Sequence, residues 1–99
     1  MLLLLAPLLA PAVRADERDD SARARAALEA GEIRPLSELL ARVESRYAGR
    51  VIETELERQR GHWTYEFKFL PEAGHIFTVR VDAATGEVVG THGPVQEKP

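Results

Sequence analysis

The stretch Ile76-Phe77-Thr78-Val79-Arg80-Val81-Asp82-Ala83-Ala84-Thr85-Gly86-Glu87-Val88-Val89 decides the fold. Phe77, Val79 and Val81 alternate with polar residues, and this period of two is typical of a strand that is buried on one side. The extended pattern resumes at Glu87 after an interval of small and polar residues. The stretch therefore predicts two strands joined by a tight turn.

The turn itself has a chemical signature at three positions. Asp82 suits the first position of a type I turn, because its carboxylate accepts hydrogen bonds from backbone N–H groups two or three residues later. Gly86 supplies the positive φ that closes such a turn with a bulge. A calcium loop needs several more oxygen ligands than this segment offers. We therefore interpret Asp82, Thr85 and Gly86 as structural turn residues.

Two further strands are predicted upstream. Aromatic residues alternate with polar ones along residues 63–69, and aliphatic residues alternate with glutamates along residues 51–57. The residues expected on the buried side are Ile52, Thr54, Leu56, Trp63, Tyr65, Phe67 and Phe69. Residues 58–61 and 70–74 have the composition of turns. Such short connections require antiparallel pairing, so the strands form a meander.

One amphipathic helix is available to cover this sheet. It follows Pro35, ends at Gly49, and carries an apolar stripe made of Leu36, Leu39, Leu40, Val43 and Tyr47. The predicted fold is α+β, with one main helix packed on a four-stranded antiparallel meander.

The flanking segments have weaker patterns. Residues 1–15 contain a short leucine-rich core followed by small residues, which predicts a signal peptide cleaved after Ala15. In residues 16–34 we expect a polar spacer and a short helix over residues 21–30, with only Leu28 and alanines to bury. Residues 93–99 lack any periodicity and are expected to form a disordered tail.

Composition excludes several classes of function. After removal of residues 1–15 the chain has 12 Lys and Arg against 16 Asp and Glu, a formal charge of −4, which argues against nucleic acid as a partner. It has no cysteine, and this excludes disulfides, thiol chemistry, cysteine-ligated metals and a lipoprotein anchor. No membrane segment is expected after signal cleavage.

Three motifs resemble the PepSY domain. They are Ala48-Gly49-Arg50-Val51, Trp63-Thr64-Tyr65-Glu66-Phe67-Lys68-Phe69 and Val79-Arg80-Val81-Asp82-Ala83-Ala84-Thr85-Gly86-Glu87-Val88. The resemblance covers residues 35–92 and implies a cystatin-like fold in a periplasmic or secreted bacterial protein. It implies no catalytic residues and no cofactor. It also implies a role in inhibiting peptidases or regulating their surroundings. Our hypothesis is a non-enzymatic binding or regulatory module that acts in trans, by inhibiting a peptidase or modulating an envelope sensor.

The uncovered face of the sheet is the candidate surface for a protein partner. Its charged residues are Glu53, Glu55, Glu57, Glu66, Lys68 and Arg80. The alternative interpretation is cross-strand charge pairing that keeps this face soluble. Trp63 is predicted to lie in the core at the end of the sheet, and the alternative is an exposed binding hot spot beside His62.

A metal- or small-ligand-binding protein is the alternative function. It would use the histidines His62, His75 and His92, of which the first two bracket a predicted hairpin and could approach each other. Two imidazoles nevertheless make an incomplete site. An enzyme is the least supported class, because the sequence shows no nucleophile–base pair and no phosphate loop.

Overall fold

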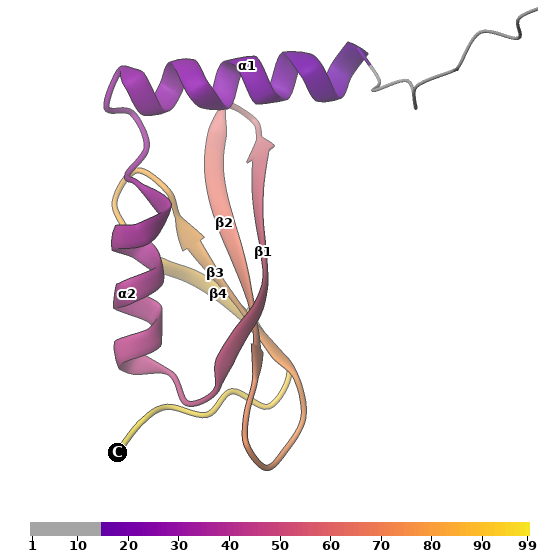
Figure 1. Ribbon diagram of the computed structural model, residues 1–99, viewed down its shortest axis with the longest axis vertical. Coiled ribbons are helices and arrows are strands. Elements are labelled where there is room, and N and C mark those ends of the chain that lie inside the picture. The colour runs from indigo at the N-terminus through magenta and orange to yellow at the C-terminus, as the bar shows by residue number, and fades with distance from the viewer. Residues whose placement is uncertain (1–14) are drawn as a thin grey trace, which may run out of the picture.

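The structure is a computed structural model that describes residues 15–99. In chain order its elements are α1 (Ala15–Glu29), α2 (Leu36–Arg46), β1 (Arg50–Gln59), β2 (His62–Leu70), β3 (Phe77–Asp82) and β4 (Val88–His92). The strands form a single antiparallel sheet in the order β1-β2-β3-β4 (Figure 1). This confirms the predicted α+β fold of a helix on a four-stranded meander. The predicted signal peptide, apart from Ala15, lies outside the described residues.

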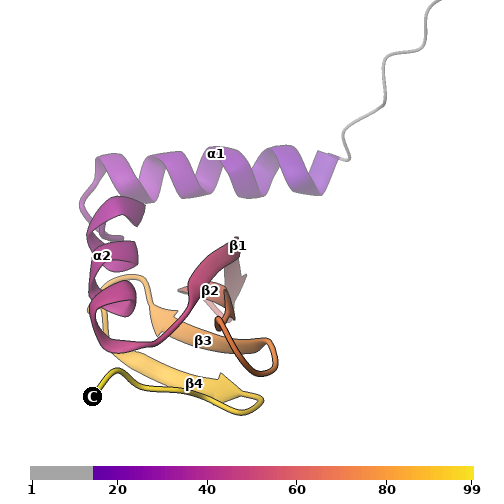
Figure 2. The same ribbon diagram turned by 60° about the horizontal axis from the view of Figure 1, so that its bottom comes forward.

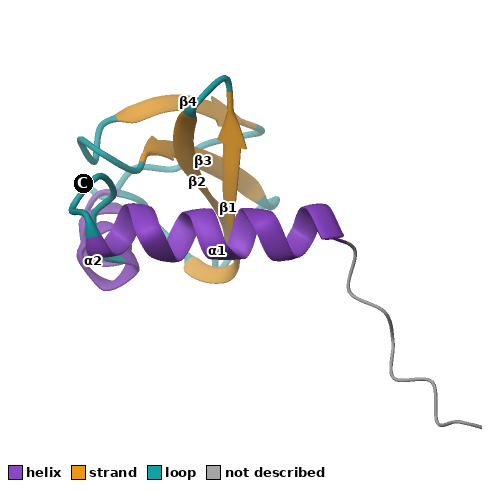
Figure 3. Cartoon of the chain, turned by 90° about the horizontal axis from the view of Figure 1, so that it is seen from above, coloured by secondary structure: helices purple, strands orange, loops and turns teal. Residues whose placement is uncertain are grey.

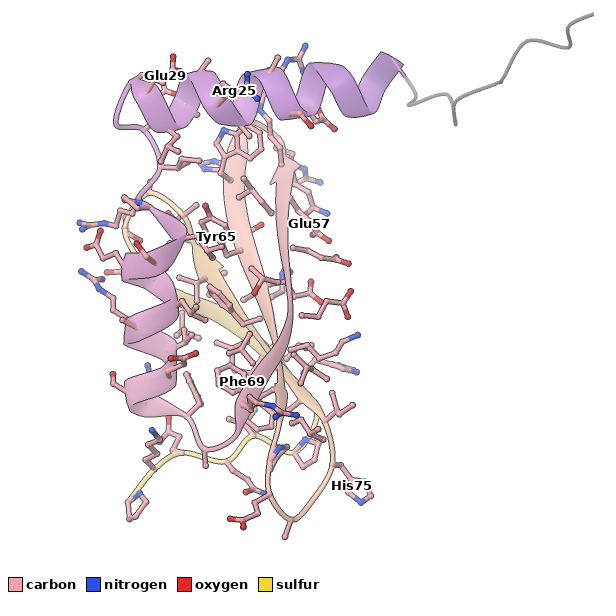
Figure 4. The ribbon with its side chains drawn as sticks, viewed as in Figure 1. Arg25, Glu29, Glu57, Tyr65, Phe69 and His75 are labelled. Carbon is pink, nitrogen blue, oxygen red and sulfur yellow. The ribbon has the colours of Figure 1, made fainter. Side chains whose placement is uncertain are left out.

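The core lies between α2 and one face of the sheet. Leu39 and Val43 of α2 pack with Phe67, Phe69 and other inward side chains of β2 and β3. In Figure 4, Tyr65 and Phe69 point from the sheet toward the helix. Leu36 is 40% exposed, so the predicted apolar stripe is correct except at its first residue.

Tyr47 closes the lower end of the core. It leaves α2 in an extended conformation, with φ −107° and ψ 144°, so the helix ends at Arg46 rather than at Gly49 as predicted. Its ring is fully buried and lies 5.8 Å from the ring of Phe69 and 6.2 Å from that of Phe77, centroid to centroid. Aromatic pairs at such distances add to the stability that burial alone provides.

A bulge in β1 corrects the prediction for Ile52. Val51 pairs with Phe69 and Glu53 pairs with Lys68, so Ile52 is the extra residue between them. Val51 packs against the core, whereas Ile52 is 43% exposed. A bulge shifts the alternation of its strand by one residue, which is why the predicted inward side chain is not buried here. Residues 54 and 56 keep the predicted orientation.

α1 is longer than predicted and includes the expected spacer. Figures 2 and 3 show it running across the end of the layers formed by α2 and the sheet. Alanine and arginine favour helix, and acidic residues interact well with a helix N-terminus, so residues 16–20 continue the helix rather than forming a spacer. Ala27 is buried, as expected for an alanine of this helix, whereas Leu28 is 46% exposed and the expectation that it packs is wrong. Gly31, with φ 74°, follows the helix as predicted.

The C-terminal tail, predicted to be disordered, pairs with the segment that links α2 to β1. The backbone N–H of Ala48 donates to the carbonyl of Gln96, and that of Lys98 donates to the carbonyl of Arg46, both at 2.8 Å. Val95 packs against the core. The chain that leaves α2 offers backbone groups that need partners, and the tail supplies them. The prediction for residues 93–99 is therefore corrected.

The predicted turn between β3 and β4 is present. One carboxylate oxygen of Asp82 accepts hydrogen bonds from the N–H groups of Ala84 (2.8 Å) and Thr85 (3.0 Å). The hydroxyl of Thr85 accepts one from the N–H of Glu87 at 3.2 Å. Gly86 has φ 80°. These side chains satisfy backbone groups of their own turn, which is a structural role.

Candidate functional site

The face of the sheet opposite α2, called the outer face here, carries all six predicted partner-binding residues. Antiparallel register arranges it in rows across β1, β2 and β3. The rows are Glu53–Lys68–Thr78, Glu55–Glu66–Arg80 and Glu57–Thr64–Asp82. None of these side chains is buried, and Figure 4 shows Glu57 pointing away from the core. Five carboxylates against two cations leave this face with a formal charge of −3.

One ion pair is formed within this face. The ammonium of Lys68 lies 2.7 Å from a carboxylate oxygen of Glu53. The hydrogen bond and the charge of Lys68 hold the pKa of Glu53 below its ordinary value, and the same pair raises the pKa of Lys68. The pair joins β1 to β2 on the solvent side, where salt screens it. The alternative of cross-strand charge pairing therefore describes part of the face.

Glu55 forms no ion pair with a cation of the described residues. A hydrogen bond with Glu53 and the negative charge of Glu53 raise the pKa of Glu55 above its ordinary value, and Glu66 and Glu57 act in the same direction more weakly. Glu66 lies directly opposite Glu55 in the register. Like charges in facing positions destabilise a sheet. The middle row therefore holds negative charge that a cationic partner can neutralise.

β1 is an edge strand of ten residues, and within residues 15–99 it has β2 as its only neighbour in the sheet. An edge strand presents backbone N–H and C=O groups that can pair with another chain. The other edge strand, β4, has only five residues and has Gly90 at its centre. It also contains a bulge, because Val89 is the extra residue between the pairs Arg80–Gly90 and Val81–Val88. β1 is thus the longer edge, and it borders the acidic side of the outer face.

Trp63 lies where the core interpretation places it. It is partly buried against the core, beneath α1, and the guanidinium of Arg58 lies 5.7 Å from its ring centroid. A cation at this distance over an indole is a favourable contact. The alternative, an exposed hot spot beside His62, does not fit this position.

His62 is not brought together with the other two histidines. His92 ends β4 and pairs with Thr78, at the end of the sheet where the loop that holds His75 enters β3. His62 begins β2, while His75 lies in the loop after the opposite end of that strand, as Figure 4 shows for His75. Nine residues of strand separate the two ends, about 25–30 Å at the usual rise. Within residues 15–99, no group of three or more His, Asp or Glu side chains is placed to hold a metal ion.

The outer face also carries Leu70, an apolar residue that we did not predict there. Leu70 ends β2 opposite Arg50 and is 37% exposed. Its place in the alternation of Thr64, Glu66 and Lys68 was a signal for this orientation. Together with exposed Ile52, it adds an apolar border to the charged rows.

These features define a class: a small helix-covered antiparallel sheet with a free, charged face and a long free edge. A family model described as "Peptidase propeptide and YPEB domain" (PepSY) matches residues 35–92. The chain therefore belongs to the PepSY family. Searches of curated proteins and of solved structures found no match.

Membership of the family establishes the general role. PepSY domains are regulatory or binding modules of the peptidase-propeptide type, generally without catalytic activity. They occur typically in extracytoplasmic proteins. Among the described residues, the structure contains no helix that is long and apolar enough to cross a membrane.

Proposed function

We propose that this chain is a non-enzymatic extracytoplasmic module that binds a protein partner in trans through β1 and the adjoining acidic rows. The partner is a secreted peptidase that the chain inhibits, or an envelope sensor whose activity it modulates. The single observation that carries the proposal is the edge of β1, which no other described strand covers, with Glu53, Glu55 and Glu57 in line on the outer face. Family membership supports the partner classes.

The chemistry of this surface selects a basic, extended segment of the partner. A segment that pairs with the edge of β1 gains main-chain hydrogen bonds along the strand. Its lysine or arginine side chains then meet the three glutamates, of which only Glu53 has an ion-pair partner among the described residues. Charge complementarity of this kind mainly accelerates association and sets specificity.

The surface can be tested directly by placing a photo-crosslinking amino acid at position 55 and irradiating the cells that express the protein. The matched control carries it at position 44, an exposed site on α2. We expect a partner to be captured from position 55 and not from position 44. Capture of the same proteins from both positions would show that the outer face has no special role.

The captured partner, once purified, allows a kinetic test. Changing Glu53, Glu55 and Glu57 together to lysine is expected to slow association at low salt by about tenfold or more. The control changes Glu29, Glu32 and Glu44 to lysine, which alters net charge equally at exposed positions elsewhere. Equal slowing in both variants would rule out a specific role for β1. A peptidase partner should lose activity as the chain is added, whereas a sensor should change its signalling output.

Export is the second part of the proposal. The leucine-rich residues 2–9 and the small residues before Asp16 support a signal peptide. Cleavage after Ala15 would remove only the first residue of α1. Mass spectrometry of the exported protein should find Asp16 at its N-terminus, and an intact Met1 would contradict the proposal.

A further inference from the structure

A shallow cavity of about 650 Å³ lies where the hairpin of β1 and β2 ends, next to β3. Its lining consists of Gln59, Arg60, His62, Thr64 and Arg80. Every one of these side chains can donate a hydrogen bond, and two of them carry a permanent positive charge. No carboxylate from the part of the chain that the structure describes lines the cavity. On a chain with a formal charge of −3, such a group of donors is unexpected.

Arg80 lines this cavity and is not paired with Glu66, the carboxylate opposite it in the sheet. In the sheet register Arg80 stands directly opposite Glu66. The two side chains nevertheless form no ion pair within 4.0 Å, although four other ion pairs are present among the described residues. Arg80 lines the cavity together with Arg60 and His62 instead. Its charge is therefore available to a ligand.

The backbone of Arg60 adopts an energetically unfavourable conformation. It has φ 53° and is the one residue other than glycine with positive φ in the described part of the chain. With Gly61 at φ 81° it forms the two-residue turn of the hairpin, where Asn, Asp and Gly are preferred. Strained residues of this kind are found preferentially at functional sites. Position 60 therefore carries an arginine, although Asn would adopt this turn conformation with less strain.

We propose that this cavity binds an oxyanion, a carboxylate or a phosphate group, between the guanidinium groups of Arg60 and Arg80. Guanidinium groups bind both kinds of anion through paired N–H donors. His62, Thr64 and Gln59 supply further donors around the anion. Glu57 and Asp82 flank Thr64 in the register, and their negative charge weakens the affinity for an anion. The site shares Thr64 and Arg80 with the outer face, but it uses neither the edge of β1 nor the three glutamates of that strand.

Nuclear magnetic resonance of the full chain tests the site with two probes, inorganic phosphate and N-acetylglutamate. Sodium chloride at equal ionic strength is the reference. We expect saturable shifts of the Thr64 amide and of the Nε–H groups of Arg60 and Arg80. Saturation by either probe supports the site, and the probe that binds tells phosphate from carboxylate ligands. Shifts that do not saturate with either probe, or that chloride reproduces, would overturn the proposal.

Two variants connect binding to the named residues. Arg60→Asn keeps a residue suited to the turn, and Arg80→Gln keeps a polar side chain on the outer face. Each is expected to weaken binding about tenfold, as loss of a hydrogen bond to a charged group does. Arg25→Gln on α1 makes the same charge change at an exposed position and should leave binding unchanged. Unchanged binding in the double variant would show that the cavity is not the site.

Discussion

Replacement of Leu39 by alanine tests which face of α2 packs on the sheet. The Leu39 side chain is fully buried, and it extends to the turn after β3, where a Cβ added at Gly86 would lie 3.1 Å from its Cδ2 atom. The neighbouring Leu40 is only partly buried. Two adjacent leucines of the same helix therefore differ in the apolar surface that they remove from water.

The expected magnitudes follow from this difference. Leu39→Ala removes three buried carbon atoms at about 0.8 kcal/mol each and leaves a cavity, for a total loss of about 2.5–5 kcal/mol. Leu40→Ala should cost about 1 kcal/mol, because part of its side chain stays in water. A domain of this size has about 5–15 kcal/mol of stability, so Leu39→Ala removes a large share of it.

Equilibrium unfolding in urea measures both losses, with the fluorescence of Trp63, the only tryptophan, as the signal. A loss below about 1 kcal/mol for Leu39→Ala would refute the described core. A larger loss for Leu40→Ala than for Leu39→Ala would show that α2 is rotated about its axis relative to this structure. Similar m-values for the two variants are needed for the comparison to hold.

Three further predictions concern the outer face, the hairpin turn and the tail. The raised pKa of Glu55 means that its charged form is disfavoured in the folded state, so stability falls as pH rises through that pKa. Glu55→Gln should therefore raise Tm at pH ~7 but not at pH ~3, where Glu55 is already protonated. An equal rise in Tm at both pH values would exclude charge repulsion as the cause of the stabilisation. Arg60→Asn should raise stability by about 0.5–1 kcal/mol in urea melts, because Asn tolerates positive φ better, and a loss would show that the turn is not strained. Deletion of residues 95–99 should cost about 1–3 kcal/mol in the same assay, because the N–H of Ala48 loses its partner; no change would mean that the tail is dispensable.

Local patterns made most of the fold predictable. The alternation along β2 and β3 identifies both strands, and Asp82 and Gly86 identify the turn, because each signal depends only on neighbouring residues. The glutamates of β1 keep their alternation with Thr54 and Leu56 after the bulge. They were therefore placed correctly on the outer face.

The errors came from interactions between distant parts of the chain. Val51 and Ile52 are both apolar, so their order alone does not show which of them is buried and which is extra in the bulge. The tail was predicted to be disordered because its partner, the chain from Arg46 to Ala48, is far away in sequence. The cavity between Arg60 and Arg80 requires the register of three strands. Neither arginine shows a local pattern that indicates the other.

The bulge at Ile52 divides β1 into two parts, and the inward–outward alternation of side chains in one part does not determine the alternation in the other. Val51 is held by its pairing with Phe69, and the residues from Glu53 onward are held by their pairing with β2. In an uninterrupted strand, loss of one residue would turn every later side chain to the opposite face. Here, deletion of Ile52 would leave a regular ladder with the three carboxylates still directed to solvent. The beginning of β1 can therefore change in length by one residue without moving charge into the core.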